Sequence, residues 1–403
     1  MSVDRPGEPV ETGPRIEPAR LENPPEAVAD LVAELSATSA KLGRSLHPRT
    51  ASHLADLVRI VNTYYSNLIE GHDTRPRDIE RALTGEFDRD EGRRNLQIEA
   101  AAHVRVQAEI DRRAVEGHLP EPASVDFVQW LHREFYRDAA DAMLRIKGAG
   151  RDFTMRPGEW RAGPEHDVAV GRHVPPSSDR VDAFMRYFAE RYRFDRMGKA
   201  GRIISMAAAH HRFNYIHPFP DGNGRVSRLV SHAMAWSADV AAHGLWSISR
   251  GLARGLESRG EYKQMMDLAD TPRQGDVDGR GNLSERALID FVVWFLRVAV
   301  DQVAFMSSLF DMDTLAARLR SLIAERGLKP EAARLLEEVL VRGEVERGEA
   351  SRITGLPERS ARRVLTDVAS EGLLASATPK RPVSLKFPAH SLETLFPRLF
   401  PHT

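Results

Sequence analysis

The sequence contains no cysteine among its 403 residues, and its positive and negative charges nearly cancel. Without cysteine the chain can form no disulfide framework, no thiolate zinc site and no cysteine nucleophile. The 57 Lys and Arg residues face 58 Asp and Glu residues, so no overall positive field attracts nucleic acid or an anionic membrane. The 28 glycines and 24 prolines are close to average, which excludes a collagen-like or wholly disordered chain.

Long apolar runs are absent as well. The N-terminal segment MSVDRPGEPVETGPRIEP lacks the basic patch and the apolar run of a signal peptide. The most apolar segment, residues 287–300, is interrupted by Asp290 and Arg297 and is shorter than the roughly 18 residues that span a bilayer. We therefore expect a soluble, cytoplasmic protein without a membrane span.

The length and the pattern of apolar residues predict two or three domains and a mainly α fold. The one clear β-hairpin candidate in the first 300 residues is 154–176, where helical spacing gives way to glycines, prolines and a Val-Ala-Val alternation. From residue 330 shorter helices precede a strand, VSLKF. We predict a disordered tail over 1–25, an N-terminal helical region over 26–120, a core over 121–310, a connector helix over 311–329 and a separate domain over 330–403.

The most informative segment is His217-Pro218-Phe219-Pro220-Asp221-Gly222-Asn223-Gly224-Arg225, with Arg228 three residues later. Its two prolines forbid a continuous helix, while Gly-Asn-Gly permits tight turns before helical spacing resumes. A turn that opens a helix presents free backbone N–H groups and the positive end of the helix dipole. Together these groups bind an anion.

Side chains around this turn are those that transfer of a phosphate-containing group needs. Arg225 and Arg228 can reach the same anion, and Asp221 beside that anion favours a bridging Mg²⁺. His217 can accept the proton of an attacking hydroxyl. Each feature alone is ordinary, but their occurrence within twelve residues favours a catalytic site.

Other catalytic frameworks fit the sequence less well. It has no G-x-x-x-x-G-K-[ST] loop, no H-E-x-x-H helix and no G-x-S-x-G elbow. His210 and His211 suggest a metal cluster with His217, but adjacent helix positions face different sides, so a packing or capping role is expected for them.

Residues 217–228 match the signature H-x-F-x-[DE]-G-N-[GK]-R-x-x-R at every fixed position, and in this they resemble the Fic (Fic/Doc) family. The segments HHRFNYIHPF and GEWR followed by VAVGRHVPP are similar to that family too. The resemblance covers roughly residues 50–300 and implies an all-helical Fic core. It also implies protein adenylyltransferase (AMPylator) activity, which moves AMP from ATP to a hydroxyl side chain of a target protein. A small β-hairpin flap that docks the target segment would include Val168, Ala169, Val170 and Gly171.

The resemblance also implies a role for each motif residue. His217 would deprotonate the target hydroxyl, Asp221 would hold Mg²⁺, and Phe219 would anchor the loop in the core. Phosphate would be bound by the loop and by two arginines, that is by Gly222, Asn223, Gly224, Arg225 and Arg228. The presence of Asp221, and of Gly224 rather than Lys, fits ATP-dependent adenylylation better than the divergent phosphotransfer or phosphocholination relatives.

A second motif lies upstream, where Ser66-Asn67-Leu68-Ile69-Glu70-Gly71 matches the family's inhibitory pattern [ST]-x-x-x-E-[GN]. Ser66 and Glu70 are four residues apart and share a helix face, and Gly71 can cap that helix. The resemblance implies a salt bridge from Glu70 to Arg228, which denies that arginine to the γ-phosphate of ATP. An ordinary helix end is the plainer interpretation. In some relatives the equivalent Glu also positions water to remove AMP, so removal is a further option.

Residues 330–403 resemble a winged helix-turn-helix domain. Arg359, Arg362 and Arg363 lie in the early turns of the expected recognition helix, where contacts with DNA are made. The segment has 11 Lys and Arg against 10 Asp and Glu, which is not a strong nucleic-acid footprint. DNA and a protein partner, including a second copy in a homodimer, are therefore equally open.

Two functions compete on these grounds. The first is a protein adenylyltransferase that is autoinhibited by Glu70 and carries an appended module. The alternative is a DNA-binding regulator whose Fic core serves as a nucleotide sensor. Intact His217 and Asp221 favour the enzyme, since a pure sensor needs neither. Neither the target protein nor the modified hydroxyl can be named from the sequence.

Overall fold

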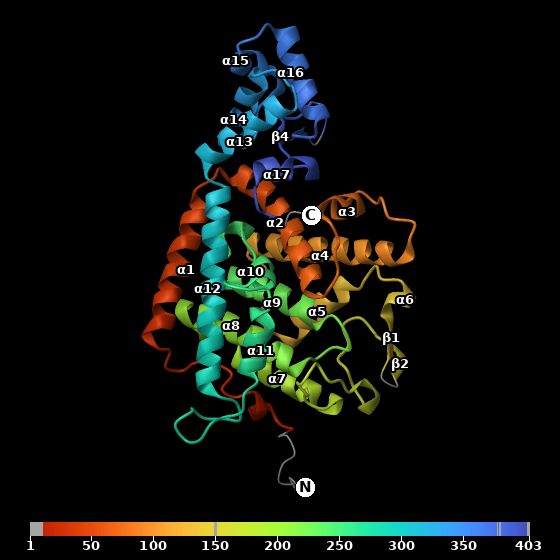
Figure 1. Cartoon of the computed structure of the whole chain (residues 1–403), viewed down its shortest axis with the longest axis vertical. Coiled ribbons are helices and arrows are strands. Elements are labelled where there is room, and N and C mark those ends of the chain that lie inside the picture. Colours follow the sequence, from red (N-terminus) through yellow and green to blue (C-terminus); the bar gives the residue numbers. More distant parts are fainter. Residues whose placement is uncertain (1–10, 149–150, 377, 379, 401–403) are drawn as a thin grey trace. The chain divides into compact units, whose positions relative to one another are not determined.

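The chain is mainly helical, with two small two-stranded sheets among the residues that the computed structural model describes (Figure 1). These residues are 11–148, 151–376, 378 and 380–400. The mainly α fold that the sequence predicts is therefore confirmed. Contacts divide the described chain into two compact units. The first holds residues 11–37, 62–241 and 247–302, and the second holds residues 38–61, 242–246 and 303–400.

Three long helices have residues in both units, namely α1 (Glu26–Arg44), α2 (Pro48–Ile69) and α12 (Glu285–Leu309). The first unit also contains α3 (Pro76–Leu83), α4 (Glu91–Val115), α5 (Val125–Phe135), α6 (Asp141–Leu144), β1 (Arg145–Gly148), β2 (Arg151–Thr154), α7 (Val181–Arg191), α8 (Lys199–Ile216), α9 (Asn223–Ser237), α10 (Ser249–Arg254) and α11 (Glu261–Ala269). The second unit contains α13 (Met312–Glu325), α14 (Glu331–Arg342), α15 (Ala350–Thr354), α16 (Glu358–Ser370), β3 (Leu374–Ala375), β4 (Ser384–Leu385) and α17 (Leu392–Leu395).

This division differs from the domain boundaries expected from the sequence. A domain boundary was expected near residues 310–330. The boundary between the two units lies instead between residues 302 and 303, inside α12. Residues 38–61, which were assigned to the N-terminal helical region, group with the C-terminal residues. Helical periodicity is continuous through α2 and α12, so it contains no signal of a boundary within them.

Helices α8 and α9 form the core of the first unit. Nearly all side chains of Ile203–Ile216 and Asn223–Ala235 are buried, and a helix that is buried all round lies inside a domain. α9 packs against α8, α4 and α5 (Figure 1). The helices α4 and α5 begin at Asp90 and Ser124, whose side chains accept hydrogen bonds from the backbone of the first turn. The loop between α8 and α9 is therefore held by packed helices.

The disordered tail expected over residues 1–25 is wrong from residue 11 onward, whereas residues 1–10 lie outside the described residues. Gly13–Ile16 form a short 3-10 helix, and Ile16 is fully buried. The Pro18 carbonyl accepts a hydrogen bond of 2.9 Å from Nη2 of the buried Arg212. A composition poor in apolar residues is misleading here, because a few buried side chains and backbone acceptors are sufficient to hold the segment.

The expected β-hairpin is also in a different place. β1 and β2 pair antiparallel through residues 145–148 and 151–154, and only Thr154 of these belongs to the segment in which a hairpin was expected. Within that segment Val170 and His173 form an isolated antiparallel bridge around Gly171, whose φ is 62°. Val168–Gly171 therefore form no regular strand, because the glycines and prolines around them interrupt backbone pairing.

In the second unit α14, α15 and α16 precede the antiparallel pair β3–β4, and Val345 forms a bridge with Val383. Gly355, with φ at 71°, ends α15 and allows the turn into α16. Three basic side chains are exposed on α16, those of Arg359, Arg362 and Arg363. The order of elements is compatible with a winged helix-turn-helix, which stays a prediction, as does its binding of DNA or of a protein.

The most apolar segment of the sequence lies within α12. Phe291 and Phe295 in that helix are fully buried. In the described part of the chain, no helix combines the length and the apolar character that crossing a bilayer requires.

The packing of the N-terminal segment can be tested by Ile16→Ala. Truncating a fully buried isoleucine is expected to lower the free energy of unfolding by about 2–4 kcal/mol. Chemical denaturation of the full chain measures this difference, with Val115→Ala at a 73% exposed valine as the comparison. An unchanged midpoint for Ile16→Ala would contradict the packing.

Candidate active site

The motif loop, residues 217–222, connects α8 to α9. α8 ends at Ile216, and His217 takes a left-handed conformation with φ at 51°, its N–H donating to Phe213 O at 3.0 Å. The two prolines of the loop prevent the helix from continuing. Gly222, with φ at 79°, then opens α9, a conformation that glycine adopts without strain.

The side chain of Asn223 braces this loop. Its Oδ1 accepts a hydrogen bond from Phe219 N, and its Nδ2 donates to Phe219 O, both at 2.8 Å. Phe219 is fully buried and stacks on the ring of His132 at a centroid distance of 3.9 Å. The side-chain amide of Asn223 therefore fixes the shape of the loop. Because both ends of this amide are already bonded to Phe219, the group at this position that could contact a phosphate is the backbone N–H.

A buried arginine holds the loop from outside the motif. Arg161, which is 1% exposed, donates from Nε to His217 O at 2.7 Å and from Nη2 to Ile216 O at 3.1 Å. The same Nη2 donates to Pro176 O, and Nη1 donates to Ser178 Oγ at 2.8 Å. Arg161 therefore ties the motif loop to the residues that follow the 168–171 segment.

The ring of His217 is neutral at physiological pH. Burial, together with the positive charge of Arg161 and the neighbouring His173, lowers its pKa from 6.5 to about 4. Within the described residues no group forms a hydrogen bond with the ring. A neutral imidazole in this state can accept a proton from a nearby hydroxyl.

Asp221 presents an ionised carboxylate whose side chain is 47% exposed. Its Oδ2 accepts hydrogen bonds from Tyr136 Oη at 2.9 Å and from Arg225 Nη2 at 3.0 Å. Burial opposes ionisation, but Arg225, the backbone of Gly222 and the Tyr136 hydroxyl keep the pKa of the carboxyl below 3.8. One oxygen is thus held in place while part of the carboxylate remains open to a ligand.

Arg225 is nearly enclosed, with 4% of its surface exposed. Its Nη1 donates to Glu99 Oε2 at 2.6 Å, and its Nη2 donates to Tyr136 Oη at 2.9 Å as well as to Asp221. The guanidinium also lies over the ring of Phe135 at 5.1 Å. The structure therefore surrounds Arg225 with two carboxylates and two rings.

The first turn of α9 has the free N–H groups on which the predicted anion site depends. The first helical hydrogen bond runs from Val226 N to Gly222 O, so the N–H groups before Val226 have no acceptor within the helix. A Cβ on Gly224 would clash with Oε1 of Glu70 and would lie 3.1 Å from Arg228 Nη1. The carboxylate of Glu70 thus lies directly over this turn, and a larger residue at position 224 would displace it.

Arg228 is held by the C-terminal end of α2. Its Nη2 donates to Glu70 Oε1 at 2.6 Å, and its Nε donates to Ser66 Oγ at 2.9 Å. Arg228 is 1% exposed, while the side chain of Glu70 is 32% exposed. Burial opposes ionisation of Glu70, yet the charge of Arg228 keeps its pKa below 4.5. Gly71, with φ at 87°, ends the helix at this point.

The structure brings most of the predicted site residues together. The motif loop, the first turn of α9 and the Ser66–Gly71 segment meet around Arg228 and Asp221. The 168–171 segment is connected to the end of α8, because His173 Nε2 and Tyr215 O form a hydrogen bond of 2.7 Å. Arg359, Arg362 and Arg363 belong to the second unit.

His210 and His211 are fully enclosed and have separate partners. His210 bonds to Ser231 Oγ and Tyr262 Oη, both at 2.9 Å, whereas His211 Nε2 lies 3.0 Å from Asp270 Oδ1. Each imidazole therefore has its own polar partners within the core. Among the described contacts, neither ring is paired with the ring of His217.

Sequence reasoning missed several residues that shape the site. Tyr136 and Arg161 bind motif residues directly, and Glu99 is the nearest carboxylate to Arg225 Nη1. His132 orients the loop through Asp221 O at 3.2 Å, while its Nδ1 accepts from Gly158 N at 2.8 Å. His132 and Tyr136 lie four residues apart on one helix face, which was the available signal for these two. Arg161 ends the GEWR segment noted in the sequence, which was a signal too, whereas Glu99 had none.

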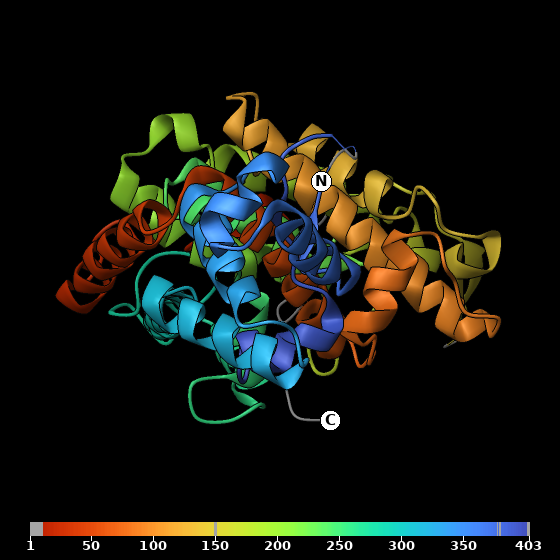
Figure 2. The ribbon, with the colours of Figure 1, turned by 90° about the horizontal axis from the view of Figure 1, so that it is seen from above.

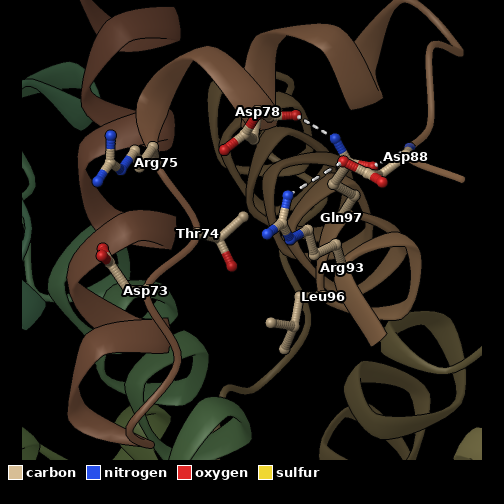
Figure 3. A pocket seen from close by; sticks show the side chains of 8 residues that line it. All are labelled: Asp73, Thr74, Arg75, Asp78, Asp88, Arg93, Leu96 and Gln97. Carbon is tan, nitrogen blue, oxygen red and sulfur yellow. Dashed lines mark hydrogen bonds and ion pairs between the residues drawn. The ribbon is translucent and has the colours of Figure 1, made fainter. Parts of the chain in front are cut away.

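A polar cavity of about 460 Å³ lies elsewhere in the first unit, beside α3 and α4 (Figure 3). These two helices pack side by side, as the orange ribbons of Figure 2 show. Its walls carry Asp78 and Arg93, and no motif residue lines it. Its polar groups bind one another, as in the 3.9 Å ion pair of Arg93 with Asp88 (Figure 3). The cavity is therefore separate from the candidate active site.

Residues 122–235 match the Fic/DOC family. The chain carries a Fic/DOC family domain. This Fic domain contains the motif loop, Arg161 and all but the last two residues of α9, whereas Glu70 and Glu99 lie before it.

Curated relatives share part of the chain. A protein adenylyltransferase Fic of Drosophila grimshawi is 25% identical over 177 residues, 43% of this chain and 33% of the relative. The protein of the same name from Drosophila virilis is 35% identical over 81 residues, 20% of this chain and 16% of the relative. The chain thus spans a third or less of the length of these relatives.

Solved structures show the same fold. A Fic family protein from Desulfovibrio desulfuricans G20 has a TM-score of 0.52 at 17% identity, over 90% of this chain and 96% of that chain. A Fic domain containing signaling protein from Bacteroides thetaiotaomicron VPI-5482 has a TM-score of 0.50 at 18% identity. The match covers 68% of this chain and 95% of that chain. The helical arrangement around the Fic domain is therefore shared with these proteins.

The neutral state of His217 can be tested by NMR titration of the histidine ring signals. Because the folded pKa is lowered to about 4, the ring is expected to stay neutral as the pH falls from 8 to 5. The His217 signal is the one missing from a His217→Gln variant. A midpoint near the ordinary value of about 6.5 would contradict the environment described.

Proposed function

We propose that the chain is a protein adenylyltransferase that transfers AMP from ATP to a Ser, Thr or Tyr hydroxyl of a target protein. The observation that carries the proposal is the meeting of three groups in 12 residues: a neutral His217, the open first turn of α9, and Arg228. The Fic/DOC domain and the name of the curated relatives support the same reaction.

In this reaction His217 takes the proton of the target hydroxyl. The hydroxyl oxygen then attacks the α-phosphorus of ATP, the bond from that phosphorus to the bridging oxygen breaks, and pyrophosphate leaves. The lowered pKa of His217 means that the base needs no prior deprotonation near pH 7. Arg161 holds the backbone of His217 and so fixes where the proton is accepted.

The anionic parts of ATP are bound by the first turn of α9 and by Arg228. Free N–H groups at a helix N-terminus and an arginine are both strong phosphate ligands. Asp221 fits a magnesium site, because it is ionised and partly exposed, and Mg²⁺ in nucleotide sites is bound by one or two carboxylates together with phosphates. When bound, Mg²⁺ would neutralise phosphate charge at this carboxylate.

The same geometry supports autoinhibition by Glu70. Its carboxylate lies over the first turn of α9 and pairs with Arg228, so it occupies two of the groups proposed for phosphate. Ser66 adds a second contact to the same arginine. A charge-assisted bond of this kind is worth about 1.5–3 kcal/mol, which reduces the productive ATP complex about ten- to a hundredfold. Removal of AMP with the help of Glu70 remains a further option of the same site.

The activity and the brake can be tested together with Glu70→Gly. Because this change frees Arg228 and leaves His217 intact, labelling of the protein itself and of lysate proteins from labelled ATP and Mg²⁺ is expected to rise about ten- to a hundredfold. Glu116→Gly is the matched control, since Glu116 also ends a helix and also precedes a glycine with positive φ. No increase over the parent with saturating ATP would reduce Glu70 to an ordinary helix end.

Two further variants separate the base from the brake. His217→Ala in the Glu70→Gly background is expected to lower the transfer rate by about 10²–10⁴ while ATP binding persists, because only the proton acceptor is lost. Arg228→Ala is expected to lose activity whether or not Glu70 is present, because both changes act through one contact. Transfer within a few-fold of the parent for His217→Ala would reject the proposed base.

A further inference from the structure

Glu99 lies on α4, before the residues that match the Fic/DOC family. Its side chain is 14% exposed, and its Oε2 accepts from Arg225 Nη1 at 2.6 Å. His72 Nδ1 is the other nitrogen near this oxygen, at 3.9 Å. Glu99 is therefore a nearly enclosed carboxylate whose short contact is with a motif arginine.

The other end of the same guanidinium contacts the proposed magnesium ligand. Arg225 Nη2, Tyr136 Oη and Asp221 Oδ2 lie within 2.9–3.0 Å of one another and form a closed triangle. Arg225 thus has one positive charge and two carboxylate neighbours, Glu99 and Asp221. If Glu99 carried no charge, the whole field of Arg225 would act on Asp221.

We propose that Glu99 is a positioning residue that offsets the positive charge of Arg225, so that the electrostatic potential beside Asp221 stays negative enough to attract Mg²⁺. This inference rests on the proposed function, because it assigns Asp221 to a metal that accompanies the nucleotide. Arg225 orients the carboxylate through Oδ2, and the negative charge of Glu99 reduces the repulsion between Arg225 and a cation at Asp221. An arginine alone would compete with the metal for the same group.

Glu99 differs from Glu70 in where its charge lies. The atoms closest to a Cβ on Gly224 belong to Glu70 and Arg228, so Glu70 lies over the anion site. Glu99 contacts Arg225, whose guanidinium is packed over the ring of Phe135. The first carboxylate therefore opposes phosphate, whereas the second supports the metal, and the two should respond to removal in opposite ways.

The experiment is calorimetric binding of ADP to the full chain in the Glu70→Gly background, with Mg²⁺ and with a chelator. The measured quantity is the ratio of the two dissociation constants, which reports how much the metal contributes to binding. Glu99→Gln keeps the shape of the side chain and removes its charge. We expect the contribution of Mg²⁺ to fall about tenfold, because one negative charge beside the cation is lost. Metal-free ADP, which is itself an anion, should bind at least as tightly.

Arg225→Gln provides a second and opposite test. It leaves the charge of Glu99 beside Asp221 without compensation, so the contribution of Mg²⁺ should rise, even if ADP binds more weakly overall. Glu109→Gln is the matched control on α4, because Glu109 pairs with the nearby Arg112 and Arg113 and does not contact Arg225. Its ratio should equal that of the Glu70→Gly parent.

Thermal melting first identifies which of the variants fold, and either charge variant alone is decisive. An unchanged ratio in a folded Glu99→Gln or Arg225→Gln protein overturns the proposal and leaves Glu99 as a structural partner of Arg225. Failure of the Glu70→Gly parent to bind ADP under either condition is a different result, since it overturns the proposed function itself.

Discussion

A buried guanidinium needs hydrogen-bond acceptors, and the two that α9 buries, Arg225 at 4% and Arg228 at 1% exposure, have carboxylates among theirs. Their partners come from two other helices, Glu99 on α4 and Glu70 at the end of α2. The ion pairs of these two arginines therefore also hold α9 against α4 and the end of α2. Removing either carboxylate changes the electrostatics of the site as well as the contacts of a helix.

The motif loop is rigid for a related reason. Its backbone groups are satisfied by side chains that lie behind it: Asn223 binds Phe219, Arg161 binds His217, and His132 binds Asp221. These contacts leave the ring of His217 and part of the Asp221 carboxylate for a ligand. A site for nucleotide transfer needs such pre-set groups, since reorganising charged groups during the reaction would cost rate.

The 168–171 segment, which is proposed to dock the target, has support of its own despite its lack of regular strands. His173 bonds to Tyr215 O at 2.7 Å and pairs with Asp270 at 3.2 Å, while Arg15 Nη2 donates to Val174 O at 2.7 Å. The N-terminal segment that composition marked as disordered thus contributes to the edge of the candidate site. Glu11 adds to this by accepting from Ser177 N at 3.1 Å.

The sequence by itself determined the helical class, the loop between two helices and the residues of that loop, because prolines, glycines and apolar periodicity act locally. It also indicated that Ser66 and Glu70 share a face, since helix spacing is local too. Only the tertiary structure decided that Arg225 is divided between Glu99 and Asp221, and that residues 11–21 are packed. Those outcomes depend on which helices meet, and contacts between residues more than a hundred positions apart have no period or spacing in the sequence that would reveal them.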